Sequence, residues 1–127
     1  ISRPILENGY VKVKRTWADN EKVILDLSMP VKIVASDPKV EANIGKRAIQ
    51  RGPLVYCVEE IDNKMNNWDD ITISSENKFT ISPGKEELDG MRILETESEG
   101  QTLTFVPYFA WDNRTPGKMK VWIDYDE

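Results

Sequence analysis

The stretch GKRAIQRGPLVYCVEE, residues Gly45–Glu60, constrains the fold more directly than any other part of the sequence. Its second half contains a short apolar run, Leu54–Val58, with a Gly-Pro pair before it and two glutamates after it. A run of this length between a chain break and charged residues is typical of a buried strand. We therefore predict that Leu54–Val58 is a strand that is apolar on both faces. Glu59 and Glu60 are expected to bring the chain back to solvent.

Apolar and polar residues alternate along most of the remaining sequence. Alternation with a period of two marks half-buried strands, and segments rich in Asp, Asn, Gly, Ser and Pro separate the alternating runs. About nine short strands at this spacing predict an all-β fold, a jelly-roll-like antiparallel β-sandwich in which residues 1–127 form a single domain. The segment Lys85–Gly90 is expected to make a single helical turn. The side chains that we expect to be mostly buried are Val11, Val13, Val23, Leu25, Leu27, Ile33, Leu54, Tyr56, Phe105, Val121 and Ile123.

The composition excludes several classes of function. The 127 residues include 17 basic and 22 acidic side chains, a net charge of −5, and no basic tract suited to a phosphate backbone, so nucleic acid is not an expected partner. No apolar run is long enough for a transmembrane helix, so a membrane is not expected either. The chain starts at Ile1 and shows no signal peptide. We interpret it as a piece of a longer protein or a processed product.

Cys57, the one cysteine, stands two residues before the glutamates, where it could be a nucleophile or a core residue. A nucleophilic cysteine needs a lowered pKa, usually from a histidine, a cation or a helix N-terminus. The chain has no histidine and the neighbours of Cys57 are apolar, so we favour a buried and inert thiol. Glu59 and Glu60 would point to opposite faces of a strand and could not jointly flank a glycosidic bond. One cysteine without histidine cannot build a thiolate-rich zinc site, so no metal is expected.

The segment FVPYFAWDNRTPG gathers Tyr108, Phe109, Trp111 and Arg114. These aromatic side chains could pack in the core around a turn, contact a neighbouring domain or stack on a sugar. On an extended strand, Tyr108 would lie opposite Phe109 and Trp111. At least one of the three should therefore point away from the sandwich interior. Tyr108, Trp111 and Arg114 are our candidates for a domain interface or a sugar contact, and no residue is assigned a catalytic role.

Two long segments resemble a known family. VEANIGKRAIQRGPLVYCVEEIDN, Val40–Asn63, and LTFVPYFAWDNRTPGKMKVWI, Leu103–Ile123, are similar to C-terminal segments of glycoside hydrolase family 127, the β-L-arabinofuranosidase-like family. Gly9–Val34 fits the strand pair that precedes the first of them. The resemblance implies an (α/α)6 catalytic barrel upstream, in which a zinc-bound cysteine acts as nucleophile with the help of a glutamate. None of the family's catalytic motifs occurs in this chain, so no catalytic residue and no cofactor is carried over to it.

The resemblance therefore implies a non-catalytic C-terminal β-sandwich that braces the catalytic barrel of the same polypeptide. An independent carbohydrate-binding module is the alternative, with plant-type glycans as a further candidate partner. We expect the isolated chain to be inactive, and the parent protein to be a glycoside hydrolase. A lone thiol is compatible with more than one compartment, and a periplasmic or extracellular location is slightly favoured for the parent.

Overall fold

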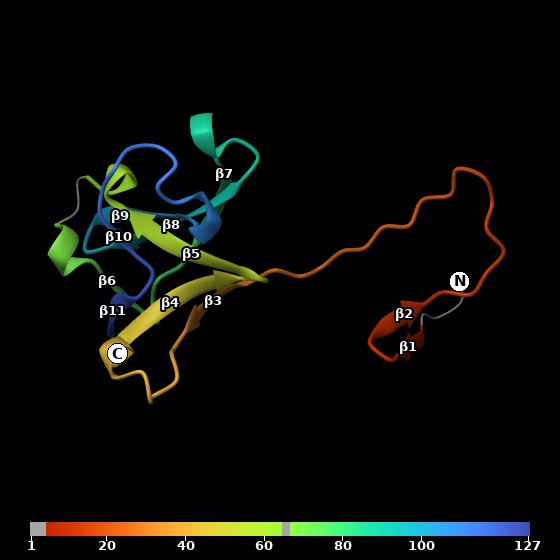
Figure 1. The fold of residues 1–127 in the computed structure, drawn as a ribbon, viewed down its shortest axis with the longest axis horizontal. Helices are drawn as coiled ribbons and strands as arrows, with labels where there is room; N and C mark the ends of the chain where they lie inside the picture. The colour runs from red at the N-terminus through yellow and green to blue at the C-terminus, as the bar shows by residue number, and fades with distance from the viewer. Residues whose placement is uncertain (1–4, 65–66) are drawn as a thin grey trace.

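The computed structural model describes residues 5–64 and 67–127. They divide into an N-terminal arm, residues 5–30, and a body, residues 31–127, from which the arm leads away as an extended chain ending in a small hairpin (Figure 1). The strands are β1 (Ile5–Glu7), β2 (Tyr10–Lys12), β3 (Val31–Val34), β4 (Lys46–Arg51), β5 (Leu54–Glu59), β6 (Thr72–Ser74), β7 (Thr80–Pro83), β8 (Arg92–Ser98), β9 (Gln101–Pro107), β10 (Met119–Lys120) and β11 (Ile123–Asp126).

Hydrogen bonds join the nine strands of the body in the order β6-β11-β4-β5-β9-β8-β7, with β3 beside β4 and β10 beside β5. The pairing of β11 with β6 is parallel, and the other strand pairs of the described residues are antiparallel. The prediction of an all-β antiparallel sandwich is confirmed. The eleven strands exceed the predicted nine because several are only two to four residues long.

The centre of the body is the β5–β9 pair, which is buried on both faces. Tyr56 and Phe105 contribute to a large apolar cluster on one face, and Cys57 and Val106 contribute to a smaller cluster on the other. Because successive side chains of a strand point to opposite faces, the continuous apolar run in β5 supplies both clusters at once. The prediction that Leu54–Val58 is a strand apolar on both faces is therefore confirmed, with Tyr56–Val58 fully buried and Val55 42% exposed.

The described residues contain no α-helix, and short 3-10 turns connect the strands. The turns are η1 (Glu41–Asn43), η2 (Glu60–Asp62), η3 (Trp68–Asp70), η4 (Glu86–Leu88) and η5 (Tyr108–Ala110). The turn η4 lies where Lys85–Gly90 was predicted to make a helical turn, and its Leu88 packs into the smaller cluster. No helix in the described part of the chain is long and apolar enough to cross a membrane.

The predicted burial is right for the body and wrong for the arm. Tyr56, Phe105 and Ile123 are fully buried, and Ile33, Leu54 and Val121 are half-buried. In contrast, all five arm residues expected in the core are exposed: Val11, Val13, Val23, Leu25 and Leu27. The alternation in the arm therefore did not predict burial, because no other described segment covers these side chains.

Candidate functional site

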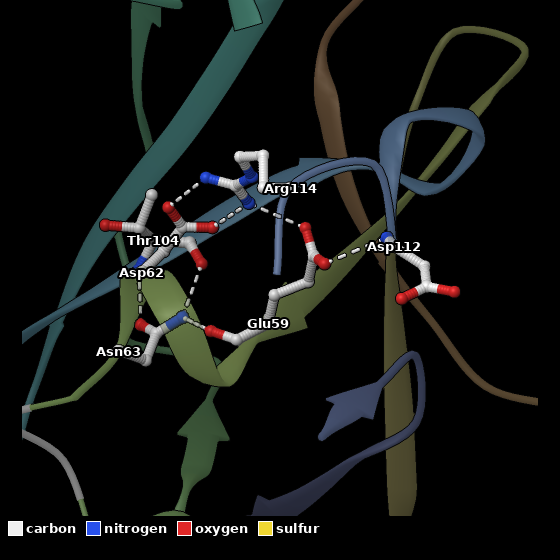
Figure 2. Close-up of polar contacts among 6 residues, drawn as sticks. All are labelled: Glu59, Asp62, Asn63, Thr104, Asp112 and Arg114. Atoms are coloured by element: carbon white, nitrogen blue, oxygen red, sulfur yellow. Dashed lines mark hydrogen bonds and ion pairs between the residues drawn. The ribbon is translucent and has the colours of Figure 1, made fainter. Parts of the chain in front are cut away.

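Arg114 lies in the loop after η5 and folds back onto the end of β5 and onto η2 (Figure 2). Its Nη2 donates to Glu59 Oε2 and Asp62 Oδ2, each at 2.6 Å, and its Nη1 donates to Asp62 Oδ1, also at 2.6 Å. The Arg114 side chain is 10% exposed, and both carboxylates are largely buried as well. The two-pronged contact with Asp62 uses the planar geometry that makes arginine–carboxylate pairs strong and specific. Hydrogen bonds to Asp62, and then to Glu59, raise the pKa of the Arg114 guanidinium, so it is charged at every physiological pH.

Glu59 does not return the chain to solvent, and this prediction was wrong. The residue is 5% exposed, because its carboxylate faces inward and meets Arg114 on one oxygen and the backbone N–H of Asp112 at 3.0 Å on the other. From sequence alone, a charged residue at a strand end is expected to be solvated. Here the Glu59 carboxylate can be buried because it forms an ion pair with Arg114, which comes from a distant loop.

Asn63 fixes the turn that presents Asp62. Its amide nitrogen donates to the carbonyl oxygens of Glu59 at 2.9 Å and Thr104 at 3.0 Å, and its side-chain oxygen accepts from the N–H of Thr104 at 2.9 Å. Asn63 is 2% exposed, and these bonds satisfy a polar side chain that would otherwise be costly to bury. The ion-paired group, Arg114 with Glu59 and Asp62, is thereby attached to β5, η2 and β9.

The aromatic segment after β9 is not an extended strand. The strand ends at Pro107 and η5 follows, so strict alternation does not apply to Tyr108, Phe109 and Trp111. Tyr108 is 46% exposed and Phe109 is 63% exposed, which confirms that at least one of the three points away from the interior. Trp111 packs against the smaller core cluster, and its ring stacks on Tyr108 with centroids 6.4 Å apart and planes 26° apart.

The structure therefore brings together two of the three candidates chosen from sequence. Tyr108 and Trp111 form one aromatic stack, while Arg114 has most of its donors committed to internal carboxylates. The sequence analysis missed the partners of Arg114 altogether. The signal was present, because an acidic EEID run follows a buried strand and the aromatic loop contains a single arginine.

Cys57 lies in the smaller cluster and is fully buried, as predicted. Burial, and then the negative charges of Glu59 and Asp62, raise the pKa of the Cys57 thiol to about 12. The thiol is therefore protonated at neutral pH, whereas nucleophiles and zinc ligands are thiolates. Among residues 5–64 and 67–127, no group of three or more Cys, Asp and Glu side chains is arranged to hold a metal ion.

Comparison with known proteins gives a consistent result. Residues 31–124 match the family described as the glycoside hydrolase family 127 C-terminal domain. A non-reducing end β-L-arabinofuranosidase from Bifidobacterium longum subsp. longum is 29% identical over 140 residues, which is 91% of this chain and 21% of the relative.

Solved structures agree with this match. A family 127 β-L-arabinofuranosidase from Geobacillus stearothermophilus T6 superposes with a TM-score of 0.67 at 30% identity, over 77% of this chain and 18% of that one. A second family 127 β-arabinofuranosidase superposes with a TM-score of 0.68 at 36% identity, over 78% of this chain and 18% of that one. The chain spans 18–21% of the length of the relatives it matches.

Proposed function

This chain belongs to the C-terminal domain family of glycoside hydrolase family 127, and from that premise we propose that it is the non-catalytic accessory domain of a β-L-arabinofuranosidase-like enzyme. Its role is to brace the catalytic (α/α)6 barrel of the same polypeptide. The relatives are β-arabinofuranosidases, which supports the enzyme class, and their much greater length supports a catalytic region outside this chain.

The observation that carries the proposal is a rigidly mounted pair of exposed aromatic side chains. Tyr108 and Phe109 lie on η5, and their neighbour Ala110 is buried at 1% exposure. The loop that follows is fixed by Arg114 and by the bond from the Asp112 N–H to Glu59. An aromatic surface that is held in place before contact loses little conformational entropy on docking, which is a property of interface hot spots.

The carboxylates near this surface are suited to structure rather than to catalysis. All four carboxylate oxygens of Glu59 and Asp62 accept hydrogen bonds from the Arg114 guanidinium or from the Asp112 N–H. A catalytic acid or base needs an oxygen open to the substrate. We accordingly propose that the isolated chain hydrolyses no glycoside, and that an assay with aryl arabinofuranosides gives no rate above buffer.

Carbohydrate binding is a second candidate because of one observation. The rings of Tyr108 and Trp111 stack on each other, and Tyr108 is partly exposed. Aromatic rings at a protein surface can pack against sugars. We rank this candidate below the domain contact, because Trp111 is itself packed against the core cluster, and Phe109 is more exposed than either ring of the stack.

The substitution Phe109→Ala tests the domain contact. In the isolated chain it should change the free energy of unfolding by no more than about 0.5 kcal/mol, because the side chain is exposed. In the full-length polypeptide it should lower the thermal stability or the activity, since an interface anchor typically contributes more than about 1 kcal/mol. Ile44→Ala is the control, because Ile44 is 68% exposed and lies outside the aromatic segment; it should have no effect in either protein.

Two results would contradict the proposal. Equal behaviour of Phe109→Ala and Ile44→Ala in the full-length polypeptide would show that η5 does not contact the barrel. Binding of arabino-oligosaccharides to the isolated chain in isothermal titration, abolished by Tyr108→Ala, would instead favour the carbohydrate-binding module.

A further inference from the structure

The arm carries a large share of the exposed apolar surface of this protein. Among the described residues, these large apolar side chains of the arm are exposed: Ile5, Leu6, Tyr10, Val11, Val13, Trp17, Val23, Ile24, Leu25 and Leu27. So many exposed large apolar side chains within one segment indicate an interaction site rather than a solvated linker. A flexible linker would instead be rich in Gly, Ser or Pro.

The apolar side chains of the arm follow strand geometry. In β1 and β2, Leu6 pairs directly with Val11, and Val13 follows Val11 on the same face. Between residues 22 and 28, Val23, Leu25 and Leu27 stand at every second position, so they would share one face of a strand. Each segment therefore has one apolar face, as a half-buried strand has, although residues 13–30 belong to no strand in this structure.

Two turns in the arm are already shaped to connect antiparallel strands. Asn8 and Gly9 both have positive φ, 51° and 81°, which is the type I′ geometry of a tight hairpin. The second turn closes with a hydrogen bond from the Glu21 N–H to the Ala18 carbonyl oxygen at 3.3 Å, with Asn20 at a φ of 61°. The arm thus has the turns of a three-stranded meander, residues 5–7, 10–17 and 22–29, but only the first pair of strands is formed.

The comparisons separate the arm from the body. The family match starts at residue 31, where β3 begins. The sequence match to the Bifidobacterium enzyme covers 91% of the chain, which leaves about 11 of 127 residues outside it and so includes most of the arm. The structural matches cover only 77–79% of the chain, about 98–100 residues, which is close to the 97 residues of 31–127. The family match thus excludes the arm, whereas the sequence match to the Bifidobacterium enzyme extends into it.

Met29 marks the junction between the arm and the body. Its Cε lies 2.7 Å from the position that a Cβ on Gly52 would occupy, so the thioether lies directly against the β4–β5 turn. The apolar face formed by Val23, Leu25 and Leu27 continues to Met29 with the same period. The arm is therefore attached to the body at Met29. No other segment of the described residues covers Val23, Leu25 and Leu27.

We propose that the arm is a set of β-strands belonging to a neighbouring sheet of the same full-length polypeptide, whose apolar face covers Val23, Leu25 and Leu27. This inference rests on the proposed function, because it takes the chain to be one domain of a longer enzyme. The relatives are about five times longer than this chain, which supplies the sequence for such a sheet. A partner in the same polypeptide has a high effective concentration, so it outcompetes a second copy. Strand addition also satisfies the backbone N–H and C=O groups of residues 22–28.

Hydrogen exchange followed by mass spectrometry tests the proposal. Amides of residues 22–28 should exchange at least about tenfold more slowly in the full-length polypeptide than in the isolated 127-residue chain, because pairing in a sheet protects them. Equal exchange in the two proteins would overturn the proposal. The amides of residues 108–111 report separately on the domain contact at η5, so the failure of either proposal is visible independently of the other.

A pair of adjacent substitutions identifies the buried face. Leu25→Asp should lower the unfolding temperature of the full-length polypeptide by several degrees, whereas Ile24→Asp, on the opposite face, should leave it unchanged. Both variants of the isolated chain should unfold like the parent chain, since Leu25 is 75% and Ile24 is 89% exposed. Equal effects of the two variants in the full-length polypeptide would contradict a one-sided strand. A concentration-dependent dimer of the isolated chain in sedimentation velocity, lost in Leu25→Asp, would overturn the proposal in favour of a second copy.

Discussion

The arm and the body both have apolar residues at every second position, but these side chains are exposed in the arm and buried in the body. Leu25 in the arm and Leu103 in β9 both belong to runs with apolar residues at every second position, Val23-Leu25-Leu27 and Leu103-Phe105, yet Leu25 is 75% exposed and Leu103 is 1% exposed. The difference is a neighbouring strand, because β9 lies between β5 and β8, while residues 22–28 pair with none of the strands in the described part of the chain. The alternation of apolar residues along a strand predicts which side chains share a face. It does not predict whether the segment that packs against this face belongs to the same domain.

The largest expected difference between the two regions concerns their ion pairs. Arg114→Ala should destabilise the isolated chain by about 3–5 kcal/mol, because it leaves Glu59 and Asp62 buried without their cation. Arg15→Ala removes the ion pair of Arg15 with Glu21 in the arm, where the arginine is 47% exposed. That loss should be about 0–1 kcal/mol, as for exposed pairs. Urea denaturation measures both, and equal losses would show that the buried carboxylates are hydrated in solution.

The next difference concerns two leucines of the same size. Leu103→Ala should reduce the free energy of unfolding of the isolated chain by about 2–5 kcal/mol, because it opens a cavity in the larger core cluster. Leu25→Ala should change it by no more than about 0.5 kcal/mol. Thermal or urea unfolding followed by tryptophan fluorescence provides the measurement. A substantial loss for Leu25→Ala would show that the arm folds back onto the body in solution.

The smallest expected effect is the pH dependence that burial of Cys57 imposes on the body. The pKa of this thiol is raised from 9.0 to about 12 in the folded chain. Below pH 9 the thiol is neutral in both states and has no effect on the pH dependence of stability. Between pH 9 and about 12 the unfolded chain releases the proton and the folded chain keeps it, so stability should fall with rising pH, by up to about 1.4 kcal/mol per pH unit.

Cys57→Ala is the matched control for this dependence. The variant lacks the ionisable group, so its stability should fall less steeply than that of the parent chain when urea unfolding is measured between pH 9 and 10.5. Parallel slopes for the two proteins would mean that the thiol ionises as readily in the folded state as in the unfolded state.

Much of the body could be predicted from the sequence because its signals are local. The apolar run Leu54–Val58, the Gly-Pro break before it and the alternation around Phe105 each depend on neighbouring residues, and each prediction was confirmed. The burial of Glu59 could not be predicted in this way, because its partner Arg114 is 55 residues away. A charge at a strand end looks the same in sequence whether it meets water or a distant cation.

The candidate site also combines features that the sequence predicts with features that only the structure reveals. Tyr108 and Trp111 were chosen from their clustering in sequence, and they do stack. The prediction that Tyr108 would lie opposite Trp111 assumed a continuing strand, whereas η5 begins directly after Pro107 and brings their rings together. A 3-10 turn of three residues has no periodicity of its own in the sequence, so only the three-dimensional structure could reveal it.

The position of β11 sets the order in which the body can assemble. This strand, Ile123–Asp126, lies between β6 and β4, pairing in parallel with the first and antiparallel with the second. Both partners are synthesised about 50 to 75 residues earlier. Among the described strands, β6 pairs only with β11, whereas β4 already pairs with β3 and β5 and lacks only the partner of Lys46 and Arg47. During translation β6 therefore cannot join the sheet until β11 has left the ribosome. Until that moment the nascent chain exposes strand edges to which a chaperone, or another copy of the chain, can bind.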